Sequence, residues 1–192
     1  MNKKNLESTI MLNSKFQIPN SKFSRGIGLV EIIIYIALLG MVSIFVINSF
    51  IQIANTYQQA RAEREVLSNG RLILETINKA IISSQEVYAP TSRFNDDAGQ
   101  LSLITPVGAT TEHITAFVDF WVDNGQLFMR QEGQGETALS AASVRINKFR
   151  MERIVQGLGR EAVKITLRVD NAPSKFSASI TLNSTSALRG NY

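Results

Sequence analysis

One apolar stretch near the N-terminus constrains this chain more than any other feature of its sequence. Between Ile27 and Ile53 there are 27 residues with a single charged side chain, Glu31. A helix that crosses the hydrocarbon core of a bilayer needs about 20 apolar residues, so this stretch is long enough to span a membrane. A buried core helix is the alternative, but in a chain of 192 residues such a helix normally has a polar face.

The net positive charge of the chain lies before this stretch. Five basic residues and one acidic residue precede Gly26, whereas the rest of the chain holds 15 basic and 15 acidic side chains. Lys22 and Arg25 immediately precede the stretch and predict an N-terminus inside the cell and the remainder outside. The balanced remainder does not favour a nucleic-acid-binding protein, and we expect no nucleic-acid partner. The absence of cysteine excludes disulfides and thiolate metal sites.

The helix is expected to continue beyond the apolar stretch. Glu75 and Lys79 form a favourable pair at i,i+4 spacing on its polar side. We predict one helix over about residues 28–84, apolar all round in residues 27–52 and one-sided in residues 53–85. The apolar residues of the one-sided half recur at helical spacing, at Val66, Leu67, Gly70, Ile73, Leu74, Ile77 and Ile81.

The residues after Pro90 are predicted to form short strands joined by turns. Asn124-Gly125 lies between two apolar runs and is a strong signal for a hairpin. The apolar phase of a strand over residues 144–151 shifts near Asn147-Lys148, as a bulge would cause. Two later segments alternate strictly and place one apolar set on one face, namely Val163, Ile165, Leu167 and Val169, then Phe176, Ala178, Ile180 and Leu182.

Strands with one apolar face need a second layer, and the one-sided helix supplies it. We therefore predict an α+β fold in which a long N-terminal helix packs on a small antiparallel β-sheet domain. The chain would divide into a basic leader (residues 1–26), an apolar helical half (27–52), an amphipathic helical half (53–85) and a β-rich head (86–192).

The residues around Glu31 resemble the N-terminal signature of type IV pilins and pseudopilins. The pattern of that family is a short basic leader ending in Gly, a hydrophobic first mature residue, and Glu at the fifth mature position of an apolar helix. Gly26 and Glu31 match this pattern, and Ile27 matches it as a hydrophobic residue. Two positions depart from what is common in the family: Ile27 stands where Phe or Met is usual, and Asn48 stands where Pro is frequent. The distal half, with a hairpin around Trp121, is similar to J-type minor pseudopilins and related minor pilins.

The resemblance implies processing and assembly. A prepilin peptidase would cut between Gly26 and Ile27, and Ile27 would become a methylated N-terminus. Glu31 would then set the register of assembly by pairing with the α-amine of a neighbouring subunit. The chain would be a minor pilin or minor pseudopilin of a type IV pilus-like filament or type II secretion pseudopilus, first held in the bacterial inner membrane by one span. Its partners would be the peptidase, the membrane, and major and other minor subunits; no cofactor is expected.

Two other classes of function remain open. The chain would be a single-span anchored binding protein if the spacing of Gly26 and Glu31 is accidental and Glu31 is an acid tolerated near the cytoplasmic interface. An anchored enzyme would need a nucleophile, a base or a metal set, and none is evident in the sequence. We therefore expect a protein that is not an enzyme.

Two polar positions of the distal half are weaker candidates. His113 is the one histidine of the chain and cannot by itself form a triad or a histidine-rich metal site, so a structural or exposed role is expected. Asp96 and Asp97 could contact Ca²⁺, but the spaced further ligands that Ca²⁺ requires are missing. We expect a solvated loop there.

Aromatic and basic residues of the distal half give two more candidates. Trp121, with Phe117, Phe120 and Phe128, would form either a binding patch or part of the sheet core, and we expect the core. Residues 144–168 hold seven basic and two acidic side chains. This stripe would suit DNA, but its charges alternate with core residues, so a solvated strand face is expected.

Overall fold

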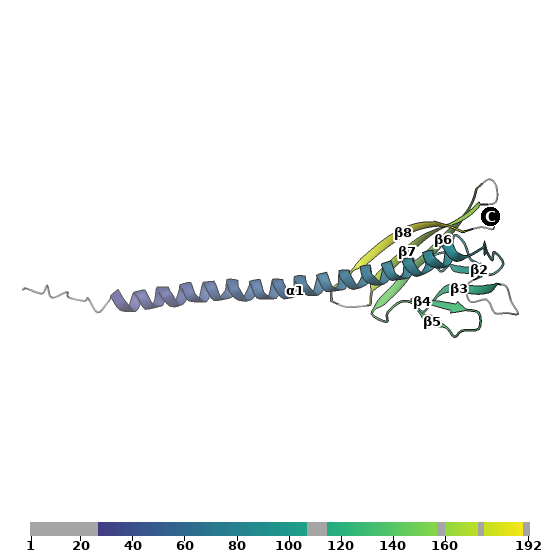
Figure 1. Cartoon of the computed structure of the whole chain (residues 1–192). Helices are drawn as coiled ribbons and strands as arrows, with labels where there is room; N and C mark the ends of the chain where they lie inside the picture. Colours follow the sequence, from purple (N-terminus) through teal and green to yellow (C-terminus); the bar gives the residue numbers. More distant parts are fainter. Residues whose placement is uncertain (1–26, 107–114, 157–159, 173–174, 190–192) are drawn as a thin grey trace, which may run out of the picture. The chain divides into compact units, whose positions relative to one another are not determined.

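The structure is a computed structural model that describes residues 27–106, 115–156, 160–172 and 175–189. In these residues one helix precedes eight strands (Figure 1). The chain divides into two compact units between Ser49 and Phe50. The elements are α1 (Ile27–Ser83), β1 (Glu86–Val87), β2 (Gln100–Thr105), β3 (Ala116–Asp123), β4 (Gln126–Gln131), β5 (Thr137–Ala138), β6 (Val144–Gln156), β7 (Arg160–Asn171) and β8 (Ser179–Ala187).

The first part of α1 exposes its side chains on every side. All side chains of residues 28–54 are exposed, including every large apolar one. The hydroxyl groups of Ser43 and Ser49 donate to the carbonyl oxygens of Leu39 and Phe45, which keeps these polar groups satisfied within the helix. A helix of this length and composition is compatible with a single membrane span or a signal anchor.

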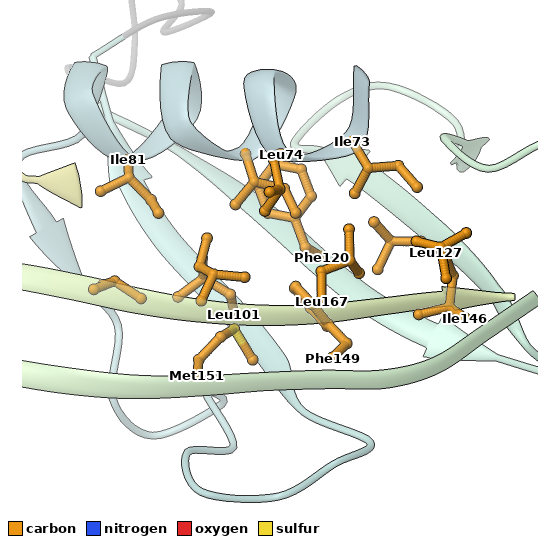
Figure 2. Close-up of a cluster of buried hydrophobic side chains, with 14 of the residues drawn as sticks. Ile73, Leu74, Ile81, Leu101, Phe120, Leu127, Ile146, Phe149, Met151 and Leu167 are labelled. Carbon is orange, nitrogen blue, oxygen red and sulfur yellow. The ribbon is translucent and has the colours of Figure 1, made fainter. Parts of the chain in front are cut away.

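The later part of α1 buries one face against strands. The predicted apolar positions are confirmed, because six of the seven are buried and Leu67 is half-buried. Figure 2 shows Ile73, Leu74 and Ile81 pointing from α1 toward the side chains of the strands beneath. A helix whose apolar residues recur at this spacing buries one stripe and leaves its polar side to solvent.

The strands form two antiparallel sheets where the sequence predicted one. The first sheet has the order β1-β2-β3-β4-β5, and the second has the order β6-β7-β8. The predicted hairpin is confirmed, since β3 pairs with β4 and both Asn124 (φ 49°) and Gly125 (φ 77°) have the positive φ that its turn demands. The predicted bulge is confirmed too, because the pairing of β6 with β7 shifts between Ile146 and Lys148.

Both sheets share one apolar core with α1. Figure 2 shows Leu101 and Phe120 of the first sheet beside Phe149, Met151 and Leu167 of the second. The alternation predicted for β7 is confirmed, as Val163, Ile165, Leu167 and Val169 are fully buried. The alternation predicted for the last segment is confirmed too, since Ala178 is buried, Phe176, Ile180 and Leu182 are half-buried, and the residues between them are exposed. β8 itself begins only after Phe176 and Ala178, and it is an edge strand.

A loop before β2 joins the first sheet to β6. Phe149 donates its N–H to the carbonyl of Asp97 at 2.8 Å and accepts from the N–H of Gly99 at 3.0 Å. The N–H of Asn95 donates to the carbonyl of Met151 at 2.9 Å. A Cβ on Gly99 would lie 2.6 Å from the carbonyl oxygen of Phe149, so glycine permits this close approach of two backbones.

Polar contacts fix the position of α1 along the second sheet. The side-chain amide of Asn78 donates to the Ser184 hydroxyl at 2.8 Å, and its oxygen accepts from the Ser186 hydroxyl at 3.0 Å. Earlier on the helix, Gln59 donates to the carbonyl of Ser177 at 3.0 Å. A slide of the helix by one turn would leave the part-buried groups around Asn78 unpaired, so these contacts favour one register. The chain has a pilin-like architecture: a long N-terminal apolar helix whose later part packs on antiparallel sheets.

Candidate functional site

The candidate site for processing and assembly lies at the start of α1. Ile27 is the first residue of the helix, and Glu31 follows about one turn later. Gly26, the predicted residue before the cut, lies outside the described residues. Glu31 is exposed and has apolar neighbours along the helix on both sides.

A second polar side chain belongs to this site, and the sequence analysis missed it. The hydroxyl of Tyr35 donates a hydrogen bond to Oε1 of Glu31 at 2.9 Å. Residues four apart lie on the same face of a helix, which brings these two side chains together. The signal that would have found Tyr35 is this spacing between the one acid and the one phenol of residues 27–53.

This pair presents a carboxylate in otherwise apolar surroundings. A charged group at the centre of a bilayer costs about 2.5–3.5 kcal/mol on insertion scales, and a hydrogen bond offsets part of that cost. Glu31 is the one charged residue of residues 27–53, so the stretch itself supplies no cation to pair with it. The site can therefore attract a cationic group from another molecule.

The aromatic residues of the first hairpin separate onto two faces. Phe120 is fully buried with Ala116 and Val118, because alternate residues of β3 point into the core. Phe117 is 37% exposed, and Trp121 is half-buried on the same outer face. The expectation of sheet core is thus confirmed for Phe120 and wrong for Phe117, Trp121 and their neighbour on β4, Phe128.

The outer face of this sheet carries aromatic and charged contacts. Trp121 stacks on Phe128 with ring centroids 5.9 Å apart, and the guanidinium of Arg130 lies 5.7 Å from the Trp121 ring. Arg130 also pairs with Asp119 at 3.2 Å. A groove of about 460 Å³ lies beside these residues, and Tyr88, Thr91, Phe117, Asp119, Arg130 and residues 131–134 line it.

The acidic loop does not have the geometry of a calcium site. Asp97 pairs with Lys148 at 3.1 Å and lies 3.7 Å from Arg150, so cations from β6 already neutralise its carboxylate. Asp96 accepts from the N–H of Ala98 at 3.1 Å. Within the part of the chain that the structure describes, no three His, Cys, Asp or Glu side chains group as metal ligands. His113 lies outside that part.

The basic stripe of residues 144–168 is largely paired with acids. Of its six cations whose side chains the structure describes, five lie in ion pairs, which leaves a face of mixed charge where a DNA-binding surface needs unopposed positive charge. The solvated strand face that the sequence predicted fits this pairing. The pairs are Lys148 and Arg150 with Asp97, Arg153 with Glu161, Lys164 with Glu152, and Arg168 with Asp170.

Three groups of the second unit have shifted pKa values. The hydrogen bond from Lys79, followed by its charge, lowers the pKa of the Glu75 carboxyl. The hydrogen bond to Glu161 raises the pKa of Arg153. Burial tends to raise the pKa of Asp170, but hydrogen bonds from Ser179, Arg168 and Asn147 together hold that pKa below its ordinary value. All three shifts arise from ion pairs and hydrogen bonds within the fold.

No known family model, curated protein sequence or solved structure matches the chain. The N-terminal residues and the architecture are therefore the grounds on which a function can be assigned. Of the regions described above, only the start of α1 combines an isolated charge with a surface that is apolar all round.

Proposed function

We propose that the chain is a structural assembly subunit, a minor pilin or minor pseudopilin of a type IV pilus-like filament or type II secretion pseudopilus. One observation carries the proposal: a helix apolar all round has its single charge, Glu31, in register with a glycine and a basic leader. The same helix continues into a half that packs on antiparallel sheets. An apolar surface on every side suits lipid first and the core of a helical filament afterwards.

Cleavage after Gly26 would prepare the subunit for assembly. Glycine before the cut lets the backbone enter a narrow peptidase site without a side chain in the way. A cut at this position leaves residues 27–53 on the mature protein, whereas an ordinary signal peptidase would remove the apolar segment. The new α-amine of Ile27, with an ordinary pKa of about 7.7–8.0, would be largely cationic near neutral pH, and N-methylation would keep its charge.

Glu31 would give the filament its axial register. In a medium of low dielectric constant, its carboxylate and the Ile27 amine of a neighbouring subunit attract each other strongly. A subunit placed one turn too high or too low would leave both charges unpaired, which typically costs about 3–5 kcal/mol for a buried pair. The peptidase would cleave the chain, the membrane would hold it before assembly, and other subunits would pair with it in the filament. The chain would catalyse no reaction of its own.

A single-span anchored binding protein is the second candidate function. The observation that favours it is the groove beside Phe117 and Arg130, where aromatic walls meet charged side chains. Such a groove would bind a ligand outside the cell and would require neither cleavage at Gly26 nor pairing by Glu31.

The mature N-terminus distinguishes the two candidates. We expect the membrane-bound chain, made together with a prepilin peptidase, to begin at Ile27 in Edman sequencing or intact-mass spectrometry. Gly26→Val should block the cut, because a β-branched side chain obstructs the peptidase site. Gly40→Val, the same change inside the span, is the control and should be cut as the parent is. A parent chain that keeps residues 1–26 beside an active peptidase would favour the binding protein.

A further inference from the structure

Tyr35 is the one residue of the apolar stretch that hydrogen-bonds to its acid. Its hydroxyl lies 2.9 Å from Oε1 of Glu31. Side chains of a helix lean toward the helix N-terminus, so Tyr35 at i+4 reaches back over the turn that carries Glu31. Tyr35 is itself 60% exposed, so the hydroxyl contact is a more specific feature of this residue than its packing.

The contact restricts a side chain that would otherwise be free to move. A glutamate has several rotatable bonds, and near the end of a membrane helix a charged side chain tends to extend toward the polar boundary. The Tyr35 hydroxyl instead holds one carboxylate oxygen, Oε1, on the helix face that the two residues share. The bond engages one of two carboxylate oxygens, and an ionised carboxylate accepts several hydrogen bonds, so Oε2 stays available to a cationic donor.

We propose that Tyr35 is a positioning residue, which orients the Glu31 carboxylate for pairing with the cationic amine of a neighbouring subunit. This inference rests on the proposed function, since the cation is the Ile27 amine that cleavage would create. Ordering the carboxylate before assembly lowers the entropy lost when the two charges meet. The phenol also supplies a partner to the acid in the unassembled subunit, where lipid supplies none.

A double-mutant cycle at residues 31 and 35 tests the inference. The parent, Tyr35→Phe, Glu31→Leu and the double variant are compared for their share in sheared filaments, at equal levels of processed membrane protein. Tyr35→Phe removes the hydroxyl and keeps the ring, and we expect it to lower the share roughly three-fold, the scale of a typical hydrogen bond inside a membrane. Glu31→Leu should lower the share further, and adding Tyr35→Phe to it should change nothing more.

The cycle separates this inference from the proposed function. Tyr57→Phe, the same chemical change at an exposed tyrosine further along α1, is the control and should match the parent. If Glu31→Leu lowers the share but Tyr35→Phe does not, the positioning role is refuted and the register role stands. An equal effect of Tyr35→Phe with and without Glu31 would also refute it, because the Tyr35 hydroxyl would then act through a partner other than Glu31. A Glu31→Leu variant that enters filaments as well as the parent would overturn both.

Discussion

Ile44 and Ile77 lie in the same helix and carry the same side chain, yet the first is 62% exposed and the second is fully buried. Around Ile44 the helix is apolar in every direction, so no stripe is set apart to face a core. Around Ile77 charged and polar residues occupy the other side, as Glu75 and Lys79 do. The comparison shows that the distribution of polar residues decides which part of a helix packs within its own chain, while helix formation and hydrophobicity alone do not.

The largest expected effect comes from truncating one of these two isoleucines. Ile77→Ala should lower the free energy of unfolding of the second unit by about 2–5 kcal/mol, because it leaves a cavity in a packed core. Ile44→Ala should leave it unchanged. Chemical unfolding of the detergent-solubilised chain checks both, followed by the fluorescence of Trp121, the one tryptophan. Equal destabilisation by the two variants would contradict the division of α1.

Two glycines of α1 provide the next comparison. A Cβ on Gly70 would lie 2.8 Å from Cδ1 of Leu182, whereas a Cβ on Gly40 would meet nothing within 4 Å. Gly70→Leu should therefore lower the free energy of unfolding by about 1–3 kcal/mol through overpacking, with some of that loss offset by better helix propensity. Gly40→Leu should not lower it. The same unfolding assay serves, and a neutral Gly70→Leu would show that β8 yields to the added side chain.

Two asparagines distinguish the parts of the helix with a smaller effect. Asn78→Ala removes the partner of the Ser184 and Ser186 hydroxyls and should cost about 1 kcal/mol. Asn48→Ala, at an exposed position of the apolar part, is the matched control and should not change the stability of the second unit. If both variants unfold at the same denaturant concentration as the parent, the polar contacts do not hold α1 in register.

The smallest effect concerns the pH dependence of stability in the second unit. The pKa of Asp170 is lower in the folded chain than its unfolded value of about 3.9. Its stabilising contribution is therefore present above about pH 4 and is lost as the pH falls through the folded pKa. Asp170→Asn should reduce stability by about 0.5 kcal/mol near neutral pH and by less in acid. Urea unfolding at several pH values measures this, with Asp123→Asn at the exposed end of β3 as control. If the parent and Asp170→Asn differ in free energy of unfolding by the same amount at every pH, the lowered pKa of Asp170 does not contribute to the pH dependence of stability.

Much of the fold follows from patterns that are local in the sequence. The end of α1 is predicted within one residue, because the apolar spacing stops at Ile81, and Pro90 and the polar run after it end the helical region. Asn124-Gly125 identified the hairpin, since few other residue pairs adopt positive φ twice in succession. The Glu75–Lys79 pair was likewise predicted from spacing alone and is seen at 2.7 Å.

The candidate site was predicted only in part. Glu31 is conspicuous as an isolated charge, but the reach of a tyrosine side chain to it depends on rotamers that the sequence does not specify. The outward position of Trp121 was missed for a similar reason. The alternation of a strand predicts that Phe120 and Trp121 lie on opposite faces of β3. It does not predict which of the two faces packs against the core.

By itself, the sequence determined the helix, its change of character near residue 53, the hairpin turn and the alternation of β7, because these depend on neighbours within a few positions along the chain. The tertiary structure decided that the strands divide into two sheets, that Phe120 rather than Trp121 enters the core, and that acids such as Asp97 neutralise the basic stripe. These outcomes depend on contacts between segments far apart in the sequence. The free energy of such contacts comes from the burial of side chains and the pairing of charges between different elements, so it cannot be predicted from neighbouring residues alone.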